Sequence, residues 1–207
     1  GKDDLAKKNL LASFALNKNY APTISSLGDI AYLEGDNAKA IEYYKKAAKL
    51  NRNDALTQFK LLICYKKTTG NEKTIAKIEK QLEILKGKKS MFYEYYLAST
   101  TILKNDKKLK REYLLKALGE NLLFENAQNA YLAYLNENKK QKHLENFLHM
   151  ISFVNNYSYG YYYFKGLSDI ANGNRDLAKT NMKYCISLNP DFEPANEFLA
   201  DLNKNVI

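Results

Sequence analysis

Residues 20–54 carry a regular pattern of small and apolar positions that predicts two short amphipathic helices. One face of the first helix carries Leu27, Gly28 and Ala31, and one face of the second carries Ala40, Tyr44, Ala47 and Leu50. A Gly-Asp pair at residues 35–36 provides the turn between the two helices. Because a pair of helices cannot bury such faces alone, we expect further helical hairpins to pack against this one.

The same spacing returns near the end of the chain, in residues 159–192. Residues 21 and 159 are each taken as the first position of a unit. Positions 8, 20 and 27 of both units are then small, with Gly166, Ala178 and Cys185 in the place of Gly28, Ala40 and Ala47. Small residues at positions 8 and 20 let neighbouring helices approach closely, so the pattern predicts a structural repeat.

These spacings resemble the tetratricopeptide repeat, a helix–turn–helix unit of 34 residues. The resemblance is carried by Leu27-Gly28, Gly35-Asp36, Ala40, Tyr44 and Ala47 in the first copy, and by Gly166, Gly173-Asn174, Ala178, Cys185 and Pro190 in the last. It implies an all-α fold, a right-handed superhelix (solenoid) of helical hairpins with about 12 helices. It also implies that the first helix of each hairpin lines a concave groove.

Weaker copies of the unit fill the rest of the chain, which we interpret as a single solenoid domain over residues 1–207. The repeats are assigned to residues 21–54, 55–90, 91–124, 125–158 and 159–192, with an N-terminal half-repeat helix at 3–18 and a C-terminal capping helix at 193–205. The second copy has Leu62 where glycine is ideal, and the third has Lys110 where alanine is expected. A polar terminal helix keeps the apolar end of a solenoid soluble.

The resemblance implies that unit positions 2, 5, 9, 12 and 13 face the groove. The candidate partner-binding residues there are Leu56, Phe59, Ile63, Lys66, Phe92, Tyr95, Ser99, Ile102 and Tyr163. Aromatic anchors in a concave surface that excludes water are what a partner peptide or helix requires. The same rings can instead pack between helices as ordinary core, and the sequence favours neither interpretation.

Members of the family that bind chaperone tails hold a C-terminal carboxylate with Lys and Asn at positions 5 and 9 of the first unit. Those positions hold Ser25 and Asp29 in this chain, and Asp29 would repel a carboxylate. We therefore expect no chaperone-tail adaptor.

The net charge of +9 is concentrated in the central third of the chain. Residues 55–116 contain 15 Lys and Arg against 6 Asp and Glu, whereas the other residues contain 17 of each kind. The predicted basic patch, on second helices and loops, consists of Lys73, Lys77, Lys80, Lys86, Lys88, Lys89, Lys107, Lys108, Lys110 and Arg111. Such a surface commonly serves solubility. The alternative is docking to an acidic protein or an anionic membrane surface.

The sequence shows no pattern typical of catalysis or of a metal site, so we expect no enzyme activity, cofactor or metal. His143 and His149 are six residues apart on one predicted helix and point to different sides. Cys64 and Cys185 fall inside predicted helices and read as buried thiols. Nucleic acid is not expected either, because the groove lacks the repeated polar pairs with which helical repeats read RNA bases.

The resulting hypothesis is a scaffold or adaptor subunit that binds a protein or peptide partner in an apolar and aromatic groove. By analogy with the family, such modules serve bacterial envelope, secretion or motility assemblies. The alternative is a peripheral binder of anionic membranes or acidic protein surfaces that uses the basic central third. The sequence leaves the compartment open between cytoplasm and periplasm, and it leaves the oligomeric state open.

Overall fold

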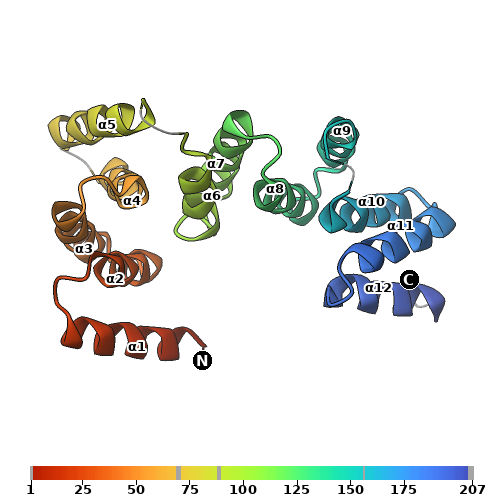
Figure 1. Cartoon of the computed structure of the whole chain (residues 1–207), viewed down its shortest axis with the longest axis horizontal. Helices are drawn as coiled ribbons and strands as arrows, with labels where there is room; N and C mark the ends of the chain where they lie inside the picture. Colours follow the sequence, from red (N-terminus) through yellow and green to blue (C-terminus); the bar gives the residue numbers. More distant parts are fainter. Residues whose placement is uncertain (1, 69–70, 88–89, 156, 205–207) are drawn as a thin grey trace. The chain divides into compact units, whose positions relative to one another are not determined.

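The computed structural model describes residues 2–68, 71–87, 90–155 and 157–204. Within these residues the chain forms twelve α-helices and no strand (Figure 1). The predicted all-α helical-repeat fold is confirmed. The helices divide into two compact units, Gly1–Glu120 and Asn121–Ile207. The register of the five repeats and the single-solenoid interpretation stay predictions.

The first unit contains seven helices. They are α1 Lys2–Leu16, α2 Ala21–Leu33, α3 Asn37–Leu50, α4 Ala55–Lys66, α5 Glu72–Lys86, α6 Phe92–Thr100 and α7 Lys107–Glu120. Aspartate side chains cap three of them. Asp36 accepts a hydrogen bond from the Lys39 N–H (3.0 Å), Asp54 accepts one from the Thr57 N–H (3.2 Å), and Asp106 accepts one from the Leu109 N–H (3.0 Å). These caps fix where α3, α4 and α7 begin.

Helix α4 is the central helix of the first unit. Ten of its twelve residues are buried, including polar ones such as Thr57, Gln58 and Lys60. Helices α3, α5 and α6 pack against it. The Lys60 ammonium donates a hydrogen bond to Asp29, and the Thr57 and Ser25 hydroxyls are hydrogen-bonded, which connects it to α2. A helix covered on so many sides needs polar partners inside the unit for its polar side chains.

Helix α6 ends earlier than the repeat pattern predicts, after a run of three hydroxyl side chains. Ser99 donates to the Tyr96 carbonyl (2.6 Å), and Thr101 donates to the Leu97 carbonyl (2.7 Å). Hydroxyls that bond to nearby carbonyls offer the backbone an alternative to continued helix. Ile102, a predicted groove residue, therefore lies beyond the helix end, where it is buried.

The second unit contains α8 Glu125–Glu137, α9 Gln141–Ser152, α10 Tyr159–Ala171, α11 Arg175–Leu188 and α12 Glu193–Asn203. Its C-terminal core contains Met182 and Cys185 of α11 and Ala195 of α12, all fully buried. Tyr163 packs against this core, with its ring centroid 5.1 Å from that of Phe192. This predicted groove residue thus takes part in the packing of α10 against the start of α12.

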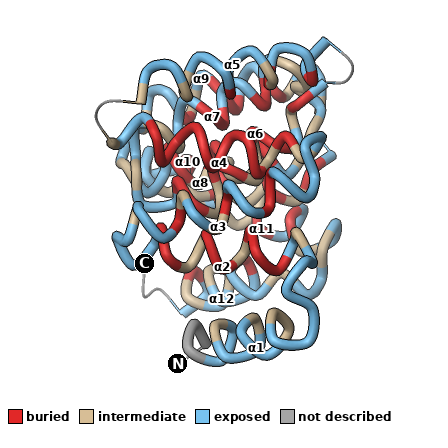
Figure 2. The backbone as a smooth tube through the Cα atoms, turned by 90° about the vertical axis from the view of Figure 1, so that its left-hand side faces the viewer, coloured by how far each residue is buried: buried red, intermediate tan, exposed pale blue. Residues whose placement is uncertain are grey.

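The two ends of the chain are covered to different degrees (Figure 2). Helix α12 buries Ala195 and Leu202 completely, whereas α1 has no buried residue within positions 5–16. Leu16 is 91% exposed on α1. No helix that the structure describes is both long enough and apolar enough to cross a membrane.

Candidate binding cleft

A cleft of about 470 Å³ opens in the first unit between α4, α5, α7 and the start of α6. Its buried floor consists of Phe59, Leu62, Ile63, Leu82, Met91, Tyr95 and Tyr113, with Leu109 half-buried beside them. Its exposed rim carries Lys66, Lys67, Lys86 and Lys116 together with Glu79, Glu83 and Glu112. We call this feature the aromatic cleft. An apolar floor with a charged rim is the usual build of a peptide-binding surface.

Three rings from three helices form the centre of the floor. The ring centroids of Phe59 and Tyr95 are 4.9 Å apart, and Tyr113 stands edge-on to both at 6.0 and 5.8 Å. The Lys116 ammonium lies 4.8 Å from the Tyr113 centroid, within the range of a cation–π contact. Contacts among the rings hold them in place before any partner arrives.

The two tyrosine hydroxyls of the floor stay protonated at neutral pH. Burial raises the pKa of Tyr113, and the Glu112 carboxylate raises it further. Burial likewise raises the pKa of Tyr95, with a further contribution from Glu120 and Glu83. Both hydroxyls can therefore donate as well as accept hydrogen bonds at the base of the cleft.

The rim alternates in charge. Lys66 pairs with Glu79 (2.8 Å) and Lys116 pairs with Glu112 (2.7 Å), and all four side chains are about half exposed. Exposed ion pairs of this kind contribute little to stability. A charged partner segment can therefore replace one member of a pair at small energetic cost.

The structure brings four of the nine predicted groove residues together in this cleft: Phe59, Ile63, Lys66 and Tyr95. Leu56, Phe92 and Ser99 do not line it, and Tyr163 lies in the second unit. Ile102 lines a separate hollow of about 460 Å³, together with Tyr32 and Lys67. The cleft therefore occupies a shorter stretch than the predicted groove.

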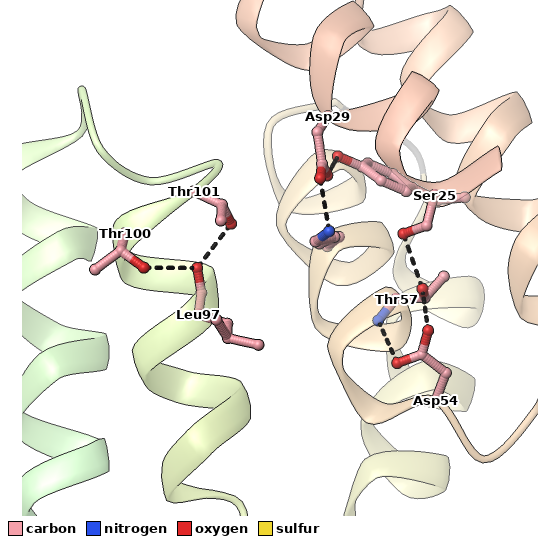
Figure 3. A network of polar contacts seen from close by, with 9 residues as sticks. Ser25, Asp29, Asp54, Thr57, Leu97, Thr100 and Thr101 are labelled. Carbon is pink, nitrogen blue, oxygen red and sulfur yellow. Dashed lines mark hydrogen bonds and ion pairs between the residues drawn. The ribbon is translucent and has the colours of Figure 1, made fainter. Parts of the chain in front are cut away.

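Polar side chains on α2 form hydrogen bonds to neighbouring helices inside the first unit (Figure 3). Asp29 accepts hydrogen bonds from the Tyr44 hydroxyl and from the Lys60 ammonium, each at 2.8 Å. The hydroxyl groups of Ser25 and Thr57 are hydrogen-bonded at 3.0 Å. Ser25 and Asp29 thus connect α2 to the neighbouring helices. The expectation that they hold no chaperone tail stays a prediction.

A sequence profile described as "Tetratricopeptide repeat" matches residues 21–54 and 159–192, the same two stretches whose helix pairs carry the small-residue spacing. These two stretches are tetratricopeptide repeats. Proteins of this family are generally adaptors without catalytic activity, and the fold points to a protein-interaction scaffold. No curated protein sequence matches the chain.

Several solved tetratricopeptide structures are similar to this chain at low identity. YrrB, described as having an unusual peptide-binding site, is 16% identical with a TM-score of 0.48, over 91% of this chain and 96% of YrrB. A tetratricopeptide protein from Parabacteroides merdae is 10% identical with a TM-score of 0.48, over 97% of this chain and 79% of that protein. TTC0263 from Thermus thermophilus is 13% identical with a TM-score of 0.47, over 88% of this chain and 98% of TTC0263. These similarities carry no information about the partner.

Eight residues of the predicted basic patch are among those that the structure of this tetratricopeptide protein describes. Lys77, Lys86 and Lys107 line three different hollows of the first unit. Lys73, Lys80, Lys108 and Arg111 are exposed, Lys110 is half-buried, and Lys88 and Lys89 lie outside the described residues. Docking of this patch to an anionic membrane stays a prediction.

Sequence reasoning missed the contribution of second helices to the cleft. Tyr113 completes the ring cluster from α7, and Glu79, Glu83 and Glu112 supply all of the rim carboxylates. The positions Leu109, Tyr113 and Lys116 have the spacing of one helix face, so that signal was present in the sequence. The tetratricopeptide pattern places the second helix of each hairpin on the convex side, so the face of α7 was not expected to line a cleft.

Both thiols of this tetratricopeptide protein should be unreactive in the native state. Burial raises the pKa of Cys64 to about 12 and that of Cys185 to about 11, and neither side chain has exposed surface. Because the thiolate is the nucleophile, we expect dithionitrobenzoate to label neither cysteine at neutral pH and both in urea. Rapid labelling of the folded protein would contradict this assignment.

Within the part of the chain that the structure describes, no group of three or more His, Cys, Asp or Glu side chains is placed to hold a metal ion. His143 and His149 are both exposed on α9, and the His149 ring contacts that of Phe153 at 5.0 Å.

Proposed function

We propose that this protein is a non-catalytic adaptor and that a short segment of a protein partner binds in the aromatic cleft. The supporting observation is the cluster of Phe59, Tyr95 and Tyr113 at the floor of a cleft that is large enough for several side chains. Preformed aromatic floors supply most of the binding energy of such interfaces.

The partner segment should be apolar or aromatic at its centre and carry charges of both signs at its ends. The floor offers the rings and two protonated hydroxyls, and the rim offers Lys and Glu side chains that already exist as exchangeable pairs. A helix or an extended strand can satisfy these requirements, since both place side chains on one face at regular intervals.

Peptides selected by display on the full chain provide the test. For the peptides with the highest affinity, we expect the Tyr95→Leu variant of the protein to bind about 10-fold or more weakly, because the change removes an aromatic ring from the floor but keeps an apolar side chain there. Affinity is measured by fluorescence anisotropy, and circular dichroism checks that the fold is kept.

Tyr134→Leu is the matched control. Tyr134 is also buried in a ring cluster, 6.2 Å from Tyr131, but it belongs to the second unit and does not line the cleft. If the two variants lose affinity equally, or if neither does, the partner segment does not bind in the aromatic cleft.

A further inference from the structure

A second hollow of about 490 Å³ lies between α3, α4 and α5 in the first unit. It shares no lining residue with the aromatic cleft, because it opens on a different face of α4. It is lined by Lys45, Ala48, Lys49, Arg52, Gln58, Leu61, Tyr65, Thr74, Lys77, Ile78 and Gln81. We call it the basic hollow.

Four cations surround the basic hollow. Lys45 and Lys49 come from α3, Arg52 from the turn that follows it, and Lys77 from α5. None of the four forms an ion pair with any residue that the structure describes, and no described lining residue carries a carboxylate. This differs from the rim of the aromatic cleft, where lysines and glutamates alternate. The field inside the hollow is therefore positive.

The floor of the basic hollow is apolar, with one amide side chain, Gln58, beside it. Leu61, Tyr65 and Ile78 are all more than nine-tenths buried. Gln58 is only 7% exposed, yet its side-chain amide makes no hydrogen bond to the described residues. The amide is not fully enclosed and faces the water of the hollow, where a bound ligand can form a hydrogen bond with it.

We propose that the basic hollow binds an acidic segment of a partner protein, with its carboxylates on the four cations and an apolar side chain on the floor. The apolar floor argues for a peptide, because a free phosphate or a lipid headgroup has no apolar part to cover Leu61 and Ile78. Backbone groups of the peptide can also satisfy Gln58. This site is independent of the partner proposed for the aromatic cleft.

The probe is a synthetic peptide of Asp and Glu residues with a central Leu-Phe pair, labelled at one end with a neutral dye. We expect it to bind the full chain with an affinity that falls steeply as salt is added. A peptide in which Asn and Gln replace every acidic residue should not bind. Binding of both peptides with similar affinity would overturn the proposal.

The variant Lys49→Glu with Arg52→Glu reverses two exposed cations of the hollow. We expect it to weaken binding of the acidic peptide by about 10-fold or more, since like charges then face each other. The matched control is Lys8→Glu with Lys18→Glu, which makes the same change in net charge at exposed positions on α1 and in the turn after it. Equal loss in both variants would show only a general charge effect and would overturn the site.

The Gln58→Leu variant tests the floor separately from the charges. It removes the amide that faces the hollow and keeps an apolar side chain of similar size, so we expect the folded state to keep its stability while the peptide binds more weakly. Unchanged peptide affinity would place the ligand elsewhere.

Two competitors distinguish other sources of negative charge. Inorganic phosphate and vesicles of phosphatidylserine should displace the peptide only weakly from the wild-type chain. The proposal fails if the peptide does not bind but phosphate or the vesicles do, and if the Lys49→Glu with Arg52→Glu variant loses that binding. The basic hollow would then be a phosphate or membrane site.

Discussion

Replacing Asp29 with alanine is expected to lower the free energy of unfolding of the first unit by about 3–5 kcal/mol. Asp29 is the partner of Lys60, whose side chain is only 6% exposed, and it also accepts a hydrogen bond from the buried Tyr44 hydroxyl. The variant leaves the Lys60 ammonium and the Tyr44 hydroxyl without the hydrogen bonds that Asp29 accepts from them. Urea unfolding followed by circular dichroism measures the change, and hydrogen exchange in α2–α4 shows where it occurs.

The double variant Asp29→Leu with Lys60→Met separates the loss of the pair from the penalty of an isolated charge. Because apolar residues of similar volume often replace a buried ion pair without loss, most of the stability should return. A double variant as unstable as Asp29→Ala would mean that the pair itself, and not the stranded Lys60, accounts for the effect.

The second large effect is expected for Gly28→Ala, which should destabilise the first unit by about 1–3 kcal/mol. A Cβ at Gly28 would lie 2.6 Å from a ring carbon of Tyr44. That ring is fully buried, and its hydroxyl is held by Asp29, so it cannot move aside. The overlap outweighs the gain in helix propensity of about 0.5–1 kcal/mol that alanine brings. Urea unfolding measures the difference.

Gly166→Ala is the control, since it occupies the same position of the last repeat. Its Cβ would meet the methyl end of Met182 at 2.7 Å, a flexible group that can turn away, and the Ala178 carbonyl oxygen at 3.3 Å. We therefore expect a smaller effect, within about 1 kcal/mol of wild type. If the two glycines behave alike, the fixed ring of Tyr44 is not what decides the cost.

The helices were predictable wherever local chemistry determines them. Small residues such as Gly28 and Gly166 recur at one position because helices approach closely there, and aspartates at positions 36 and 54 cap the helices that follow. Gly35 adopts a φ of +85° in the turn between α2 and α3, a conformation that glycine adopts readily. These signals depend on a few neighbouring residues, which a sequence displays directly.

The cleft was less predictable, because it depends on contacts between distant helices. Lys60 looks like a surface lysine in sequence, but α4 is covered on enough sides to bury it against Asp29. Ile102 fits the groove position of a full-length helix, but the hydroxyls of Thr100 and Thr101 end α6 before it (Figure 3). The sequence places Tyr113 on one helix face with Leu109 and Lys116, but only the packing of α7 against α4 and α6 decides that this face lines the cleft.

The burial of α4 limits how the first unit can be shortened. In a solenoid each repeat contacts only its neighbours, and α4 follows this rule, because α3 and α6 belong to the predicted repeats before and after it. Ten residues of α4 are buried under α3, α5 and α6. A truncation after α4 would remove α5 and α6, two of the helices that cover it, so we expect the shortened unit to lose the packing of α4 as well.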